Sequence, residues 1–492
     1  MFFYPATRNL PEMVIELRTI DVIDSFERVA KVTFSKESIE KWKQKASILS
    51  GGDAKSMMFQ QRYYMILQQL FRDSKFVDTA RGKRGADFPM ISFGADRAAD
   101  SKSNQATEVN GHSLFLIHET GGENSWRFEI TPVESLPGSV GVKVVFGMLT
   151  KGEDGKLVVE DIHQSVPIKL DSVRSTDDYI TENIFVLLKG EMVDDNFVVS
   201  EMTLPPIPQR SLCESSMNLF GGPFELTEEL VSTTLGHSPE DSSIAVLANV
   251  VIDSTRTLER LHAMFSGFEE CDAVPAIFVL CGDFCSRAFN PHNGDTLRNF
   301  QKSFESFSQL LARHPATLEK SKIVIVPGPN DPGSGILPQP PFTDSLVRGL
   351  SARFPNVILA SNPCRIRFYD KQIVVFTGNT VEHIRKNRLV ASSSITLDDE
   401  GLKLTRCLLS QMHLVPGPVH QQNVVWEHDA GMKLYPPPHA LFLHEPSAAP
   451  FIKDHYGETI VVGMPTFSTN DERESEFHLY SPFSNESTLS SL

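Results

Sequence analysis

Residues 323–332 read Ile-Val-Ile-Val-Pro-Gly-Pro-Asn-Asp-Pro, an apolar run that ends in a proline-rich turn. Four consecutive β-branched residues predict a buried strand over Ile323–Val326. Strand Ile277–Cys281 leads in the same way into Gly282-Asp283, and strand Ile244–Ile252 leads into Asp253. Strands that alternate with helices predict an α/β sandwich with polar residues at its strand ends. The apolar positions at helical spacing after two of these turns are Leu258, Leu261 and Phe265, and then Phe300, Phe304, Phe307 and Leu311.

Strand ends of this kind are where a two-metal phosphoesterase keeps its ligands, and here several ligands are missing. Two cations roughly 3.5–4 Å apart need about half a dozen Asp, His and Asn side chains. The usual Asp-x-His motif reads Asp253-Ser254-Thr255, and the usual Gly-Asn-His-Asp/Glu motif reads Gly328-Pro329-Asn330-Asp331. Proline cannot bind a metal. We therefore expect the layout of a phosphoesterase with no catalytic residue, no metal and no cofactor.

The remaining ligand positions are interpreted as degenerate. The usual Gly-His-x-His motif after strand Ala440–Leu443 reads His444-Glu445-Pro446, which keeps one imidazole. A residual phosphodiesterase that uses a single metal at Asp253, Asp283, His413 and His444 stays open as an alternative. The structural expectation is that Asp253 caps the next helix, that Asp331 caps a turn and that Asp283 accepts backbone hydrogen bonds within its own turn. The degenerate positions are Asp253, Asp283, Asp331, His413 and His444.

Residues 113–205 read as short strands separated by Gly, Asp and Asn turns. Five such strands predict an OB-type barrel. Residues 141–205 carry 6 Lys and Arg against 12 Asp and Glu. Because a groove for single-stranded nucleic acid needs positive charge, we expect protein docking, with single-strand binding as a weaker alternative. The predicted strands are Val142–Leu149, Leu157–Val159, Val166–Leu170, Ile184–Leu188 and Phe197–Val199.

The predicted domains are 1–90, a short and partly helical N-terminal segment; 91–210, the OB domain with its connector; and 211–492, the phosphoesterase-like sandwich. In the first of them Phe59, Tyr63, Ile66 and Leu70 recur on one face of a helix. Loops stiffened by proline, Leu337–Phe342 and 436–438, are candidate contact elements for a partner.

Composition limits the function classes. The chain has 492 residues, 40% of them hydrophobic, and a net charge of −16, which disfavours broad attraction to nucleic acid. Six cysteines without a Cys-x-x-Cys pair suit a reducing compartment. No apolar run reaches the ~20 residues that span a bilayer, so we expect an intracellular protein with no membrane partner.

Six motifs follow one another in order: Asn218–Pro223, Phe278–Phe284, Val326–Gly333, Ile336–Pro341, Asn362–Ile366 and Leu409–Leu414. Together they resemble the B subunits of eukaryotic replicative DNA polymerases, and within these the epsilon branch. The resemblance runs from about Met58 to the C-terminus.

The resemblance implies an OB barrel joined to an inactivated, calcineurin-like phosphoesterase domain. It implies a nuclear, noncatalytic accessory subunit that holds the C-terminal region of the DNA polymerase epsilon catalytic subunit and that contacts DNA only indirectly. It also implies a link to the replicative helicase, including GINS. Members of this branch tend to begin with a separate helical module, and we expect the chain to contain less than a full copy of it.

Overall fold

A computed structural model of the protein describes residues 21–24, 51–72, 76–78, 128–152, 154–171, 173, 178–214, 242–369, 371–389, 397–418, 423–446, 451–468 and 474–492. Contacts divide the chain into two compact units. The larger unit contains 1–58, 207–386 and 395–492, and the barrel unit contains 59–206 and 387–394. The division at residues 90 and 210 stays a prediction. No described helix is both long and apolar enough to cross a membrane.

The first sheet of the larger unit carries the strand that decides the fold. Its central strands are parallel, and they are buried on both faces. In β10, Phe278 and Leu280 belong to the core that faces the helices, while Ile277 and Val279 belong to the core between the two sheets. The strand order is β12 (Val357–Leu359), β11 (Lys322–Val326), β10 (Ile277–Cys281), β9 (Ile244–Leu247), β18 (Glu476–Ser481) and β19 (Glu486–Ser491).

The strand predicted over Ile244–Ile252 is shorter than expected. β9 ends at Leu247, and Asn249 adopts a positive φ of 53°. The backbone then turns, and Val250 donates to the carbonyl of Cys281 at the end of the neighbouring strand. The prediction was wrong in length because apolar residues continue through this buried turn.

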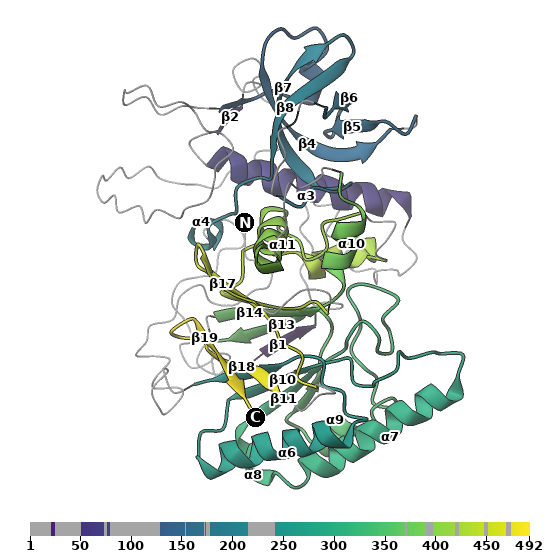
Figure 1. The fold of residues 1–492 in the computed structure, drawn as a ribbon, viewed down its shortest axis with the longest axis vertical. Helices are drawn as coiled ribbons and strands as arrows, with labels where there is room; N and C mark the ends of the chain where they lie inside the picture. The colour runs from purple at the N-terminus through teal and green to yellow at the C-terminus, as the bar shows by residue number, and fades with distance from the viewer. Residues whose placement is uncertain are drawn as a thin grey trace, which may run out of the picture. The chain divides into compact units, whose positions relative to one another are not determined.

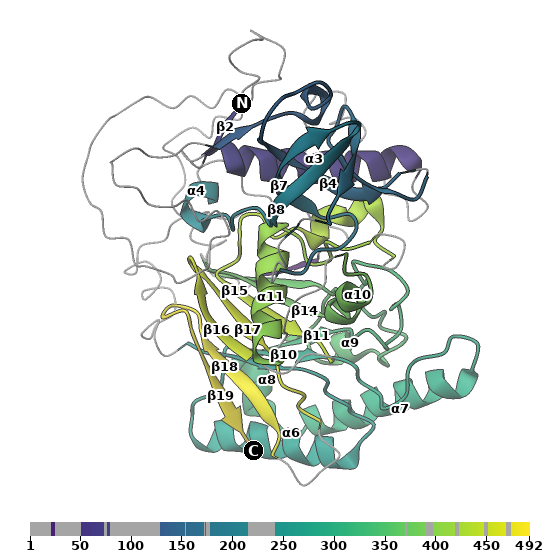
Figure 2. The ribbon, with the colours of Figure 1, turned by 45° about the horizontal axis from the view of Figure 1, so that its top comes forward.

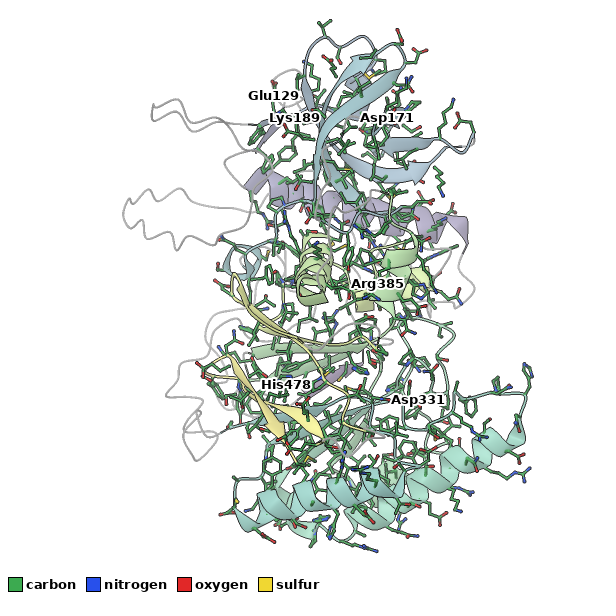
Figure 3. All side chains as sticks on the ribbon, in the orientation of Figure 1. Glu129, Asp171, Lys189, Asp331, Arg385 and His478 are labelled. Atoms are coloured by element: carbon green, nitrogen blue, oxygen red, sulfur yellow. The ribbon has the colours of Figure 1, made fainter. Side chains whose placement is uncertain are left out.

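The second sheet packs on the first through a core that includes Ile366, Phe368, Val375 and Phe442. Figures 1 and 2 show α11 (Leu397–Ser410) and α10 (Thr380–Lys386) on its other face. The two helices are joined by a bidentate ion pair from Arg385, labelled in Figure 3, to the buried Glu400. The strand order is β1 (Asp21–Asp24), β13 (Cys364–Phe368), β14 (Lys371–Thr377), β15 (Ala440–His444), β17 (Thr459–Gly463) and β16 (Phe451–Tyr456).

Helices α6 (Thr255–Glu270), α7 (Gly294–Leu311) and α8 (Pro315–Lys320) cover the first sheet (Figure 1). Both predicted helical stripes are confirmed, since all their members are buried except Leu258, which is partly buried. The core here is aromatic, with ring centroids 5.0–5.8 Å apart among Phe284, Phe300, Phe304 and Phe342. Other short helices in the described part of this unit are α4 (Arg210–Glu214), α9 (Leu350–Arg353) and the 3-10 helix η4 (Trp426–Met432). The α/β sandwich predicted from the sequence is therefore present.

The barrel unit contains the five predicted strands. They close in the order β4-β5-β6-β8-β7, because β7 pairs again with β4. β6 and β8 are parallel, and the other pairs are antiparallel. The strands are β4 (Lys143–Lys151), β5 (Leu157–Glu160), β6 (Ser165–Lys169), β7 (Phe185–Val193) and β8 (Asn196–Thr203), preceded by β2 (Phe76–Asp78), β3 (Phe128–Ile130) and the 3-10 helix η2 (Val133–Ser135).

Two further pieces of chain complete this unit. The predicted helix is present as α3 (Gly52–Arg72), and from Phe59 onward it belongs to the barrel unit. Tyr63 of α3 lies 5.2 Å from Phe146 and 6.1 Å from Phe185, between ring centroids. The second piece is distant in sequence: Leu389 donates to the carbonyl of Ile180, and Thr181 forms a bridge with Arg388.

We predict that Phe304→Ala lowers the free energy of unfolding by about 3–5 kcal/mol, because it leaves a cavity among four packed rings. Urea denaturation followed by circular dichroism measures the change. Leu489→Ala is the control, since Leu489 is 49% exposed, and it should change the free energy by less than about 0.5 kcal/mol. Equal changes in the free energy of unfolding for the two substitutions would show that the packing of these rings does not stabilise the fold.

Candidate functional site

Two turns meet at the ends of neighbouring parallel strands and are hydrogen-bonded to each other. Cys281 of β10 pairs with Val326 of β11, so the turns that follow them are adjacent. Asp331 accepts from the backbone N–H groups of Gly328, in its own turn, at 2.8 Å and of Phe284, in the other turn, at 3.0 Å. Asp331 therefore caps its turn as predicted, and it also fixes the neighbouring one.

Asp283 makes the reciprocal link. It accepts from the backbone N–H of Asn330 at 2.8 Å and from the side-chain Nδ2 of Asn330 at 2.6 Å. The prediction that Asp283 bonds within its own turn was wrong, because both donors come from the turn after β11. Sequence reasoning also missed the role of Asn330, although an amide beside a row of turn residues is a usual signal of such capping.

The two turns approach so closely that neither Gly282 nor Gly328 has room for a side chain. A Cβ on Gly282 would lie 1.9 Å from Oδ2 of Asp331, and a Cβ on Gly328 would lie 2.4 Å from Oδ1 of Asp283. Here glycine is required by the close approach of two backbones.

One carboxyl group and one thiol of this cluster have raised pKa values. Burial of Asp331, which is 2% exposed, together with the negative charge of Asp283, raises its pKa to about 8, although its two backbone hydrogen bonds act in the opposite direction. Burial also raises the pKa of Cys285 to about 12, with Asp253, Asp331 and Asp283 adding to the effect. Cys285 is therefore a thiol at neutral pH and no nucleophile.

Asp253 lies exposed at the rim of the cluster. It accepts from the backbone N–H of Ser286 at 3.0 Å and from its hydroxyl at 2.7 Å. The prediction that Asp253 caps α6 was wrong, because Ser254 is the cap and accepts from Thr257 at 3.4 Å. A pocket of 270 Å³ opens here, lined by Asp253, Ser286, Asn330, Asp331 and the first turns of α7.

His444, at the end of β15, is 4% exposed. Burial lowers its pKa, whereas a 3.3 Å contact of Nδ1 with the carbonyl of Met464 and the charge of Asp283 act against that shift. The next residue, Glu445, has a role that sequence reasoning missed. It accepts from the backbone N–H groups of Thr380 and Val381 at 3.1 and 3.2 Å, and thus caps α10. Burial raises the pKa of Glu445 to about 7.

His413 belongs to a different cluster. It is fully buried, its Nε2 lies 3.0 Å from Asp429, and its Nδ1 accepts from the backbone N–H of Val415 at 3.0 Å. Lys433 lies 3.8 Å from the same carboxylate. Both ring nitrogens of His413 are thus used inside the protein. Among the residues that the structure describes, no group of three or more His, Cys, Asp or Glu side chains is placed to hold a metal ion.

The proline-rich loop after the second turn is tied to the site by Gln339. Gln339 is 1% exposed and donates to the carbonyl of Gly328 at 3.0 Å, while its backbone pairs with Asn362. Residues 436–438 are buried, so the prediction of a partner-contact loop there was wrong. Prolines in that stretch pack inside the fold, and the carbonyl of Pro437 accepts from Arg210.

Comparison with protein families gives two matches. The family of B subunits of DNA polymerases alpha and epsilon matches residues 244–453, and the OB-fold domain of DNA polymerase epsilon subunit 2-like proteins matches residues 52–206. The chain is 32% identical to the B subunit of DNA polymerase epsilon from Arabidopsis thaliana over 370 residues, which cover 74% of this chain and 69% of that protein. It is 31% identical to DNA polymerase epsilon subunit 2 of Bos taurus, covering 68% of this chain and 64% of that protein. The matched region thus spans about two thirds of these relatives.

Comparison with solved structures gives weaker likenesses. An archaeal phosphodiesterase matches with a TM-score of 0.28 and 9% identity, over 51% of this chain and 99% of that one. A dimetal phosphatase from Danio rerio matches with a TM-score of 0.27 and 8% identity, over 49% of this chain and 92% of that one. TM-scores this low support no conclusion about fold or chemistry.

We predict that Gly328→Ala destabilises the protein by about 1–3 kcal/mol or more, because the added methyl group must displace Asp283 or the facing backbone. Gly267→Ala in α6 is the matched control. No atom lies within 4 Å of its added Cβ, and removal of a helical glycine should stabilise by about 0.5–1 kcal/mol. Thermal denaturation of both variants measures the change in stability. An unchanged stability of Gly328→Ala would contradict the close contact between the two turns.

We also predict that part of the stability falls with rising pH through Asp331. An acid whose pKa rises on folding stabilises the fold below its unfolded pKa, near 3.8, and loses that contribution as the pH approaches the folded value of about 8. The advantage of the wild type over Asp331→Asn should therefore shrink between about pH 5 and pH 9, by as much as several kcal/mol at ~1.4 kcal/mol per pKa unit. Urea titrations at both pH values measure it. Parallel pH profiles of the two proteins would show that Asp331 is not the titrating group.

Proposed function

The chain belongs to the family of DNA polymerase epsilon B subunits, and on this premise we propose that it is a noncatalytic accessory subunit of DNA polymerase epsilon. It binds and stabilises the C-terminal region of the catalytic subunit and helps to link the polymerase to the replicative helicase, including GINS. It acts in the nucleus during chromosomal replication, and it contacts DNA only indirectly.

The observation that carries the noncatalytic part is the use of the strand-end carboxylates within the fold. Asp283 and Asp331 accept hydrogen bonds from the two turns that they join. A carboxylate that already accepts these structural hydrogen bonds would have to lose them in order to bind a cation. Pro329 stands where a phosphoesterase would carry a histidine. Both facts support a phosphoesterase-like domain that has lost its chemistry.

The metal-dependent alternative is weakened by His413. The single-metal site considered from the sequence needs this imidazole beside Asp253, Asp283 and His444, yet both of its ring nitrogens contact Asp429 and Val415. No ring nitrogen is then available without breaking the buried cluster.

A partner-binding role is also supported by charge. The barrel segment from 141 to 205 is acidic, with 6 Lys and Arg against 12 Asp and Glu. Such a surface repels a phosphate backbone and attracts basic polypeptide.

We predict that the purified chain forms a stable one-to-one complex with the C-terminal region of the epsilon catalytic subunit, measured by size-exclusion chromatography with light scattering. The chain alone should hold no stoichiometric manganese or zinc by elemental analysis and should not hydrolyse a chromogenic phosphodiester with added Mn²⁺.

Asp283→Ala and Asp171→Ala provide the matched pair for the hydrolysis assay, because Asp171 is an exposed carboxylate that lies outside the cluster. Turnover that Asp283→Ala abolishes and Asp171→Ala preserves, in folded protein, would establish an enzyme and remove the noncatalytic proposal. Absence of a complex would remove the accessory-subunit proposal.

A further inference from the structure

One end of the barrel exposes apolar side chains. Val140 is 88% exposed, Val142 is 60% exposed and Val193 is 45% exposed. We call these three residues the valine patch. In the part of the chain that the structure describes, they are three of six large hydrophobic side chains with such exposure, and the other three belong to the larger unit.

Strand register places the three valines together. Lys143, the first residue of β4, pairs with Gly190 of β7. Residues just before Lys143 and residues just after Gly190 therefore leave the pairing at the same end of the barrel. Val193 closes β7 opposite Asn196, at the hairpin into β8. At about 3.3 Å per residue, all three valines lie within three residues, or roughly 10 Å of chain, of that pair.

Negative charge lies on the hairpin that carries Val193. Glu191, Asp194 and Asp195 are exposed there, while the nearby cations are Lys143 and Lys189, of which Lys189 is paired with Glu201. None of the three carboxylates has an ion-pair partner among the described residues. The hairpin corresponds to one of the loops with which OB barrels bind ligands, but the carboxylates of Asp194 and Asp195 at its tip and of Glu191 beside it disfavour an oligonucleotide.

We propose that the valine patch is a docking surface for a basic polypeptide segment with an apolar anchor, and, resting on the proposed function, that this segment belongs to the epsilon catalytic subunit. The valines bury against the anchor, and the hairpin carboxylates pair with its Lys or Arg side chains. Apolar contacts of this kind set the dissociation rate, while the charged rim speeds association and selects for basic partners.

The test compares dissociation constants for the C-terminal region of the catalytic subunit, measured by biolayer interferometry with the full chain. The double variant Val140→Ser/Val142→Ser should weaken binding about tenfold or more, because two exposed valines lose their buried contacts. The double variant Glu191→Lys/Asp195→Lys should slow association and reduce its dependence on salt. Asp194 is left unchanged because its φ is 53°.

Leu489→Ser and Asp171→Lys are the controls, since both positions are exposed and lie outside the valine patch. They should leave the dissociation constant within about twofold. If the wild type binds and the valine variants bind equally well, the surface is wrong and the accessory role stands. If the wild type does not bind, the accessory role fails too. If sedimentation shows a dimer that the valine variants lose, the occupant is a second copy of this chain, and the proposal is overturned.

Discussion

The close contact between two turns is the constraint on which the larger unit depends. Gly282 and Gly328 let two backbones meet where β10 and β11 end, and Asp331, Asp283 and Asn330 supply the hydrogen bonds between them. The ends of two central parallel strands are thereby fixed against each other. Neighbouring segments are attached to these turns by further hydrogen bonds. Gln339, in the next loop, donates to the carbonyl of Gly328, and Asp253 accepts from the hydroxyl of Ser286.

Sequence patterns predicted what depends on local periodicity. Alternation and turn spacing located all five barrel strands, and the phenylalanines of α7 located the helix layer, because burial repeats with the period of each element. Sequence patterns did not predict the ends and caps of elements that are set by contacts between distant segments. The run after Leu247 is apolar enough for strand, yet it turns at Asn249 so that Val250 can bond Cys281. The N-cap of α6 is Ser254 and not Asp253, because the Asp253 carboxylate accepts a hydrogen bond from Ser286 instead.

The candidate site shows the same limit. Spacing identified Asp253, Asp283 and Asp331 as neighbours, because the ends of adjacent parallel strands must meet, and all three act on Cys285. It could not separate His413, whose partner Asp429 comes from a distant 3-10 helix. Nor could it reveal Glu445 as the cap of α10, since the two are far apart in the sequence. The ligand positions inferred from motifs alone therefore include residues that lie in one cluster, such as Asp283 and Asp331, and a residue that lies elsewhere, His413.

The barrel unit is discontinuous along the chain, because residues 387–394 complete it although the residues on either side belong to the larger unit. This imposes an order on biosynthesis. The five barrel strands are translated long before Arg388 and Leu389, so the contacts of these two residues with Thr181 and Ile180 can form only after most of the larger unit has been translated.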